Sequence, residues 1–406
     1  SVATMEAVRY GTSVAFGDYD RDGWLDIHVN EWGHPTQPPA LKSHARLLRN
    51  NGAAIPGTFS DVTLSSGVYL DNMLGSSRED IDMPFVLSFA SRFTDLDQDG
   101  YPDLVIASDF NTSRLYWNNR DGTFTDGTTA SNFGTDENGM GLAVGDYDAD
   151  GQLDVFITSI YHTDPAGQDH NEGGNWGVTG NRLYRNMGNR QFSDATDSAQ
   201  VRKGDWGWGT TFFDYNNDQH LDLMMTNGIL VGDFETDRSL LWKNVGGGVF
   251  EDVSLEVGVT DSASGKGLLT FDYDNDGDLD VFIVNNGQEP VLYRNDQSDD
   301  NAWLKLKLVG NESNRDGIGA LVTVTPDLSD PTKLMIRELD GGSNFLSQND
   351  LIAHFGLGAS TDPIAQVSIR WPSGMKQDFL NISPNATYVA YEGTIQLDVF
   401  APDPIA

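Results

Sequence analysis

The residues of this chain with the clearest chemistry are acidic, and they recur in five nine-residue segments. Each segment begins and ends with Asp and places oxygen-bearing side chains at positions 1, 3, 5 and 9. Position 6 is Gly in four of the five, which permits a sharp turn. Carboxylates crowded this closely repel one another unless a cation lies among them, and calcium prefers several oxygen ligands. The segments, here called the first to fifth Asp loops, are DYDRDGWLD (18–26), DLDQDGYPD (95–103), DYDADGQLD (146–154), DYNNDQHLD (214–222) and DYDNDGDLD (272–280).

The sequence predicts that these loops bind four to five calcium ions. In the fourth loop Asn216 replaces an Asp and Gln219 replaces the Gly, so weak binding and no binding are both open for it. The ions are expected to rigidify the turns rather than to act in catalysis. The predicted ligands are Asp18, Asp20, Asp22, Asp26, Asp95, Asp97, Asp99, Asp103, Asp146, Asp148, Asp150, Asp154, Asp214, Asn216, Asp218, Asp222, Asp272, Asp274, Asp276 and Asp280.

The first half of each Asp loop matches an EF-hand loop, but the second half does not. Counted from Asp272, the twelfth residue is Ile283, where an EF-hand requires Glu. The flanking segments are short and apolar or Gly-rich, which is typical of strands and not of helices. The pattern therefore favours a calcium site on a loop between two strands.

The elements that must position the Asp loops repeat with them. Short runs on either side of each loop, such as LLTF and VFIVNN around the fifth, predict two strands. A third repeated element follows (RLLRNNG, RLYWNNRDG, RLYRNMGN, LLWKNVGG, VLYRN), and a fourth occurs in the first four modules (TFSDVT, TFTDGT, QFSDAT, VFEDVS). A β-sandwich is the rival fold, but modules with one internal order favour radial repetition. The prediction is an all-β, calcium-binding β-propeller with five readable blade modules and up to seven blades.

The pattern changes after about residue 300, where no further Asp loop occurs. ALVTVT, QVSIRW and TYVAYE alternate as strands of a half-buried sheet do. We therefore expect a propeller in residues 1–300, a small β-sandwich-like domain in 301–398 and a tail in 399–406.

Charge and composition restrict the partners and the compartment. The 406 residues contain 25 Lys and Arg against 61 Asp and Glu, a formal net charge of −36, so nucleic acid and anionic membrane surfaces would be repelled. No run reaches the ~18 apolar residues of a membrane span, so no membrane insertion is expected. The absence of Cys excludes disulfides, thiolate metal sites and a Cys nucleophile. Acidity with dense cation sites favours a secreted or extracellular protein, or a periplasmic one.

The Asp loops, with the LYRN and F.DVT elements, resemble the FG-GAP/VCBS repeats of integrin-α-type propellers over about residues 10–298. SNRDGIGALVTV, ELDGGSNFLSQND, HFGLG and VSIRWPSG, within residues 313–374, resemble the ASPIC/UnbV domain of the cartilage acidic protein family and its bacterial relatives. The resemblance implies a secreted, calcium-loaded propeller with a small β domain. Members are mostly described as extracellular matrix or adhesion proteins or are uncharacterised, and a few occur among enzymes of natural-product pathways.

A ligand is expected on the face opposite the Asp loops. The long insertions 31–45, 69–84, 161–180, 201–209 and 229–237 fall in loops of that face, and function usually lies in such loops. A glycan, an extracellular protein or a small molecule would bind there. The predicted ligand-binding residues are Trp32, His34, Trp176, Lys203, Asp205, Trp206, Trp208 and Asp233. The alternative interpretation is that the Gly-flanked Trp residues pack between blades.

The densest polar cluster gives the candidate catalytic residues, which are His162, Asp164, His170 and Glu172. Two imidazoles and two carboxylates could bind a transition metal or carry out acid–base chemistry. A solvated loop tip is the alternative. The leading hypothesis is a secreted calcium-binding β-propeller that recognises a ligand. The second is a calcium-stabilised hydrolase, lyase or cyclase, with natural-product biosynthesis as one setting.

Overall fold

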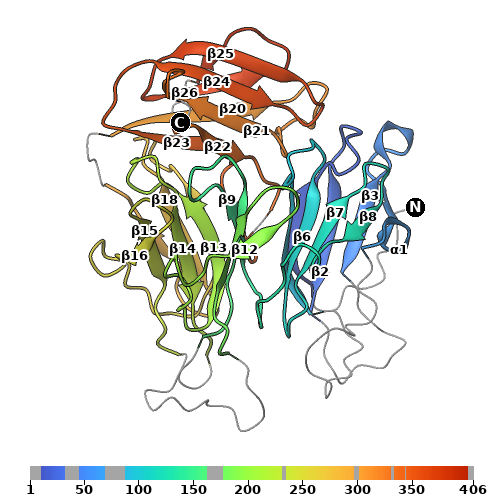
Figure 1. The fold of residues 1–406 in the computed structure, drawn as a ribbon, viewed down its shortest axis with the longest axis vertical. Helices are drawn as coiled ribbons and strands as arrows, with labels where there is room; N and C mark the ends of the chain where they lie inside the picture. Colours follow the sequence, from blue (N-terminus) through green and yellow to red (C-terminus); the bar gives the residue numbers. More distant parts are fainter. Residues whose placement is uncertain are drawn as a thin grey trace.

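The computed structural model describes residues 11–32, 45–68, 87–161, 177–230, 235–296, 301–330, 333–342 and 344–400. Within these ranges the protein is all-β, apart from the four-residue helix α1 (Thr63–Ser66) and one turn of 3₁₀ helix at Gly52–Ala54. The strands form five sheets in residues 11–293 and two further sheets in residues 302–399 (Figure 1).

The five N-terminal sheets share one plan, in which each strand pairs antiparallel with the next strand along the chain. Four sheets have the four predicted strands, and the fifth has three, because its module lacks the fourth repeated element. The sheets, in chain order, are β1 (Gly11–Gly17), β2 (Asp26–Glu31), β3 (Arg46–Asn50) and β4 (Phe59–Asp61); β5 (Ser88–Thr94), β6 (Asp103–Ser108), β7 (Arg114–Asn118) and β8 (Phe124–Asp126); β9 (Leu142–Gly145), β10 (Asp154–Ile157), β11 (Arg182–Asn186) and β12 (Phe192–Asp194); β13 (Gly207–Phe213), β14 (Asp222–Asn227), β15 (Leu240–Asn244) and β16 (Phe250–Asp252); and β17 (Gly265–Phe271), β18 (Asp280–Asn285) and β19 (Val291–Tyr293).

Each Asp loop joins the first two strands of its sheet, as predicted. The ninth residue of every loop is the first residue of the second strand, and it pairs with the last residue of the first strand, as Asp26 does with Gly17. All five loops therefore lie at the same end of the strands in their sheets, and this end of the sheets is here called the loop edge. In the chain the insertions follow the second and fourth strands, whose last residues lie at the opposite edge, here called the insertion edge.

Repeated asparagines join each sheet to the one before it. The side chain of Asn118, the last residue of β7, donates a 2.9 Å hydrogen bond to the main-chain oxygen of Tyr19 in the first Asp loop. Asn186, Asn244 and Asn295 make the equivalent bonds to Leu96, Tyr147 and Tyr215. The first strands β1, β5, β9, β13 and β17 also contact one another in that order. Neighbouring sheets are therefore related by the same contacts throughout.

The C-terminal domain consists of two four-stranded sheets around one apolar core. Their strand orders are β23-β20-β26-β27 and β22-β21-β24-β25, and β20 and β26 run parallel. Leu304 and Phe355 from the first sheet pack with Val322 and Ile369 from the second. The three strands predicted for this domain are confirmed as β21, β24 and β26. The elements are β20 (Ala302–Val309), β21 (Leu321–Thr325), β22 (Met335–Glu338), β23 (Ile352–Gly358), β24 (Ile364–Arg370), β25 (Lys376–Ile382), β26 (Ala386–Tyr391) and β27 (Asp398–Val399).

The segment 339–350, between β22 and β23, lies among the first strands of the N-terminal sheets. On one side, the N–H of Phe16 in β1 donates a 2.7 Å hydrogen bond to the oxygen of Gly341. On the other, the hydroxyl of Ser347 donates to the oxygen of Leu268 in β17, at 2.7 Å. The first and fifth sheets are therefore connected through the C-terminal domain.

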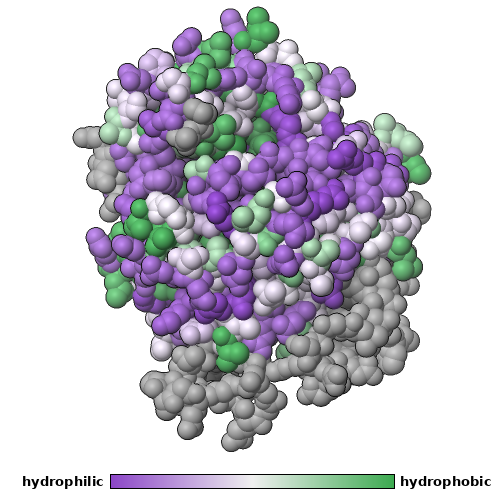
Figure 2. Space-filling model, viewed as in Figure 1, coloured by the Kyte–Doolittle hydropathy of each residue, from purple (hydrophilic) through white to green (hydrophobic). Residues whose placement is uncertain are grey.

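The surface matches the acidic composition. Figure 2 shows mostly hydrophilic residues on the face of the molecule seen in Figure 1, with apolar residues scattered among them. Among the described residues, no helix has the length and apolar character needed to cross a bilayer.

Candidate metal centres at the loop edge

The main chain of each Asp loop wraps around the carboxylate at position 1. In the first loop the N–H groups of Asp22 and Gly23 donate to the two carboxylate oxygens of Asp18, at 2.9 and 3.0 Å. The glycine at position 6 has a φ of 87° in this loop, which is the left-handed region that favours glycine. In the fourth loop Gln219 adopts the same conformation, with a φ of 85°. A non-glycine residue pays a cost of about 1–2 kcal/mol there.

The carboxylate at position 9 belongs to the framework of the hairpin. Asp26 accepts hydrogen bonds from the main-chain N–H groups of Tyr19, at 3.3 Å, and of Asn50, at 2.8 Å. The equivalent pair of bonds occurs in all five loops. The ninth Asp therefore holds the loop and the third strand together, a role that the spacing alone does not reveal.

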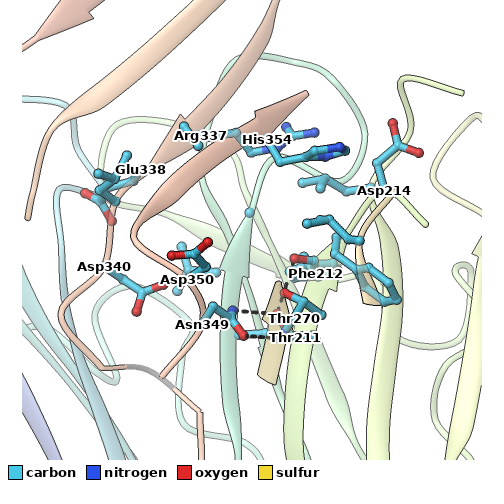
Figure 3. A pocket seen from close by; sticks show the side chains of 18 of the residues that line it. Thr211, Phe212, Asp214, Thr270, Arg337, Glu338, Asp340, Asn349, Asp350 and His354 are labelled. Carbon is cyan, nitrogen blue, oxygen red and sulfur yellow. Dashed lines mark hydrogen bonds between the residues drawn. The ribbon is translucent and has the colours of Figure 1, made fainter. Parts of the chain in front are cut away.

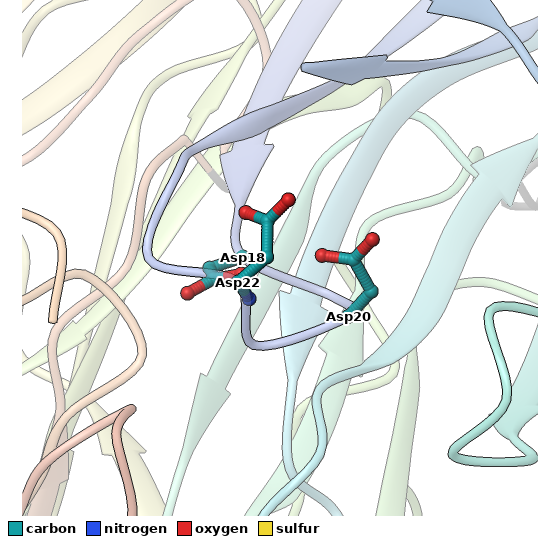
Figure 4. A group of neighbouring side chains, drawn as sticks. All are labelled: Asp18, Asp20 and Asp22. Atoms are coloured by element: carbon teal, nitrogen blue, oxygen red, sulfur yellow. The ribbon is translucent and has the colours of Figure 1, made fainter. Parts of the chain in front are cut away.

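The remaining carboxylates converge. Oxygens of Asp18, Asp20 and Asp22 lie within 4.8 Å of one another, and Figure 4 shows the three side chains on the turn between β1 and β2. Similar groups occur in three other loops. Asp95, Asp97 and Asp99, and likewise Asp272, Asp274 and Asp276, occupy positions 1, 3 and 5, whereas the group in the third loop, Asp146, Asp148 and Asp154, includes the ninth residue. These oxygen-only groups have the donor chemistry that calcium requires.

Three of these loops contain a buried carboxylate oxygen without a hydrogen-bond partner. The atoms are Oδ1 of Asp20, Asp95 and Asp148, in the first, second and third loops. Their side chains are only 14%, 4% and 11% exposed. An unpaired acceptor is costly to bury, and a cation bound at each loop would satisfy it.

The middle carboxylates carry basic neighbours from the third strands. Arg49 in β3 lies 2.7 Å from Asp20, and Arg185 in β11 lies 2.5 Å from Asp148. These arginine side chains are 48% and 39% exposed, so they can swing into solvent at little cost. The repeated RN of the third element signals these residues.

In the fourth loop an amide of the loop and a lysine of β15 both lie beside the carboxylate of Asp218. The amide nitrogen of Asn216 donates to Asp218 at 2.9 Å, and the ammonium of Lys243 lies 3.6 Å from the same carboxylate. Within the described residues no group of three converging carboxylates forms in this loop. The loop in which Asn216 replaces an Asp is therefore also the loop without three converging carboxylates among the described residues.

Burial raises the pKa values of several carboxyl groups in these loops. Desolvation, with repulsion from Asp22 and Asp20, raises the pKa of Asp18 to about 7. Desolvation likewise raises the pKa of Asp146 to about 7 and that of Asp26 to about 8. The ionised loops are thus destabilised by their own charge when no cation is bound.

All five Asp loops touch the C-terminal domain, which covers the loop edge in Figure 1. Arg21 donates to the oxygen of Pro372, Asp95 pairs with Arg370, the N–H of Gly358 donates to the oxygen of Asn217, and Asp272 pairs with Lys305. Leu153 of the third loop belongs to the same apolar cluster as Ile336 of β22. No local sequence signal indicates these pairs, because the partners are far apart in the chain.

A polar cavity of about 110 Å³ lies between the N-terminal sheets and this domain (Figure 3). Arg337 and His354 line it from β22 and β23, and Asp214 lines it from the fourth loop. The Nε2 of His354 lies 3.0 Å from the oxygen of Gly277, and burial lowers the pKa of this histidine to about 4. The imidazole is therefore neutral at physiological pH and part of the domain interface.

The predicted ligand residues that the structure describes lie at the insertion edge. The indole nitrogen of Trp32 donates to Asp109 at 3.2 Å, and the N–H of Trp206 donates to Asp237 at 3.4 Å. Lys203 is exposed and Asp205 is half-buried. Trp208 is only 8% exposed and packs against Phe345 and Phe89, with Lys266 over its ring at 4.2 Å. In this arrangement Trp208 belongs to the packed interior of this edge.

Several predicted residues lie outside the described part of the chain. They are the ligand candidates His34, Trp176 and Asp233 and the catalytic candidates His162, Asp164, His170 and Glu172. His28, beside the first insertion, is fully buried, and its Nδ1 lies 2.8 Å from the hydroxyl of Ser91. Burial lowers the pKa of His28 to about 3, so it is a neutral core residue.

Comparison with protein families agrees with this arrangement. Residues 95–157 and 169–225 match the FG-GAP-like repeat, and residues 310–396 match the family described as ASPIC and UnbV. The chain therefore contains FG-GAP-like repeats followed by an ASPIC and UnbV domain. Such repeats, in sheets of this plan, fit a β-propeller-like fold.

Among individual proteins the chain is similar to cartilage acidic protein 1. It is 27% identical to the protein of Homo sapiens over 385 residues and 25% identical to that of Mus musculus over 382 residues. Each alignment covers 90% of this chain and 50% or 49% of the relative. The chain thus spans about half the length of the curated relatives it matches.

Solved structures give only a distant likeness. The biofilm matrix protein Bap1 of V. cholerae has a TM-score of 0.37 at 11% identity, with 93% of this chain and 60% of that one covered. The exotype rhamnogalacturonan lyase YesX has a TM-score of 0.38 at 14% identity, with 91% and 61% covered. At these scores neither structure supports an inference about this chain.

Proposed function

We propose that this protein is a secreted β-propeller whose Asp loops bind calcium, with a ligand recognised at the insertion edge. The proposal rests on one observation. Equivalent loops of three sheets each contain a buried carboxylate oxygen without a hydrogen-bond partner, in Asp20, Asp95 and Asp148. Burying such acceptors is costly, and a cation bound at each of these loops would offset that cost. The first three Asp loops are therefore the principal calcium sites.

The donor chemistry favours calcium over other divalent ions. The converging groups contain carboxylates only, without the imidazole or thiolate ligands that zinc prefers. Curled acidic loops suit calcium, which accepts flexible oxygen coordination, better than magnesium, which requires near-ideal octahedral geometry and retains its waters. The sites would bind best where calcium is plentiful, which supports the proposal of secretion.

The proposal is tested by calcium titration of the chelator-treated protein. We expect calcium chloride to raise the melting temperature by roughly 10 °C, because several ions bind the folded state alone. Replacing Asp20 by Asn should remove one ion from the stoichiometry measured by isothermal titration calorimetry. Asp121→Asn is the matched control, because Asp121 is an exposed acid of a hairpin turn. A melting temperature insensitive to both chelator and calcium would contradict the proposal.

A further inference from the structure

The fifth Asp loop is neutralised by a more deeply buried cation than the second loop, where Arg370 of the C-terminal domain pairs with Asp95 but is 23% exposed. Lys305, in β20 of the C-terminal domain, places its ammonium against the carboxylate of Asp272, at position 1 of the loop. Their side chains are 5% and 3% exposed, so the pair is buried at the domain interface. The main-chain N–H groups of Asp276 and Gly277 donate to the same carboxylate, and both of its oxygens therefore have partners.

Lys305 is fixed by its surroundings. It lies in a strand that is paired on both sides, opposite His354 of β23 and beside Thr387 of β26. The ring of Trp303 lies 5.2 Å from its ammonium. Whereas Arg49 and Arg185 reach their loops from the exposed surface, Lys305 reaches Asp272 from within the buried domain interface.

The fifth loop also lacks the feature that carries the calcium proposal. Within the described residues, buried carboxylate oxygens without a partner occur in the first three Asp loops and not in the fifth. Asp274 and Asp276 are exposed, so solvent already stabilises their charge. Among the described residues, this loop therefore has no buried carboxylate oxygen that needs a cation as its partner.

We propose that Lys305 is the resident cation of the fifth Asp loop, so that this loop binds no calcium while the C-terminal domain is docked. The inference rests on the proposed calcium binding by the first three loops. An ion at the equivalent position would lie against a buried ammonium, where like charges repel strongly. The loop with the most regular acidic sequence is thus a docking site for a lysine of the same chain.

The test compares equivalent positions of two loops in the full chain. Asp20 and Asp274 both occupy position 3, in the first and fifth loops. Titrated with calcium chloride in a calorimeter, Asp20→Asn should bind one ion fewer than the wild type. Asp274→Asn should bind the same number as the wild type. Loss of an ion in Asp274→Asn would overturn the assignment of Lys305.

A second pair of variants tests the lysine directly. Lys305→Met should bind one ion more than the wild type, because the freed Asp272 joins Asp274 and Asp276 as a ligand. Lys307→Met, which removes an exposed charge from the same strand, should leave the count unchanged. A folded Lys305→Met with the wild-type count would overturn the inference, and if this variant does not fold, the Asp274→Asn comparison decides. A wild type that binds no calcium would overturn the proposed function itself, whereas binding with a lost ion in Asp274→Asn rejects only the role of Lys305.

Discussion

The carboxylates of the Asp loops meet three kinds of positive charge, although their sequences are nearly the same. In the first and third loops an exposed arginine from the third strand lies beside position 3 and can be displaced. In the fourth loop Lys243 and an amide take that place. In the second and fifth loops the charge comes from the C-terminal domain, as the partly exposed Arg370 and the buried Lys305. The basic residues beside the Asp loops therefore distinguish loops whose acidic sequences are nearly the same.

The raised pKa values of Asp18 and Asp146 predict how calcium changes the pH dependence of stability. Both pKa values are about 7 in the calcium-free fold, against 3.8 for the unfolded chain. The folded state therefore binds more protons, and the free energy of unfolding falls as the pH rises from about 4 to 7. Calcium requires the ionised form, so it should stabilise the protein most above pH 7. We expect melting temperatures in chelator to fall between pH 5 and 7.5, with a much smaller fall in calcium chloride.

The double variant Asp18→Asn and Asp146→Asn is the control for this pH dependence. Its amides do not titrate, so its melting temperature in chelator should depend less on pH than that of the wild type. If the slopes in chelator and in calcium were equal, the carboxylates would not be the calcium ligands.

At the scale of elements, the segment 339–350 joins sheets that do not otherwise pair. The ring of Phe345 lies 5.0 Å from that of Trp208 and 5.7 Å from that of Phe89, between β13 and β5. The side-chain amide of Asn344 donates to Leu268 in β17, and its oxygen accepts from the N–H of Thr210 in β13. The segment thus packs against the first strands of the second, fourth and fifth sheets.

Replacing Phe345 by Ala should therefore destabilise the whole chain. The ring is only 5% exposed, and truncating a buried Phe costs about 3–5 kcal/mol. Urea unfolding followed by tryptophan fluorescence should show one transition at a lower midpoint. Leu346→Ala is the matched control, because Leu346 is 53% exposed and should cost less than about 0.5 kcal/mol. A similar loss in both variants would show that the packing of Phe345 does not carry the effect.

The strands and the Asp loops could be predicted because their signals are local. Alternating apolar residues and a fixed acidic spacing recur within each module, and the fourth strand is missing from the fifth sheet as it is from the fifth module. The docking of the C-terminal domain could not be predicted in this way. Arg21 contacts Pro372 across 351 residues, and nothing near either residue indicates its partner. Likewise, the spacing marks the ninth Asp as a ligand, whereas Asp26 accepts main-chain hydrogen bonds from Tyr19 in the loop and Asn50 in the third strand.

At the scale of the whole molecule, the proposal assigns different tasks to the two edges of the sheets. The C-terminal domain contacts the loop edge, and the proposed ligand site is at the insertion edge. There Trp32 lies beside Phe89 and bonds to Asp109, and Lys203 is exposed. Aromatic rings beside polar groups suit the recognition of a glycan.

A glycan array tests this division. Trp32→Ala should lose binding to any neutral glycan that the wild type retains. The matched control is Trp24→Ala, because Trp24 lies on the first Asp loop at the other edge and is 43% exposed. Melting temperatures measured in calcium would separate loss of binding from unfolding. Loss of binding in Trp24→Ala alone would place the ligand at the loop edge.

The position of segment 339–350 also has a consequence for the order of folding during synthesis. The five N-terminal sheets leave the ribosome before this segment does, and the segment is hydrogen-bonded to both β1 and β17. Until then, polar groups such as the N–H of Phe16 lack their final partners. The nascent sheets must therefore wait, partly solvated, for the last quarter of the chain, and that interval is when the protein most needs protection from aggregation.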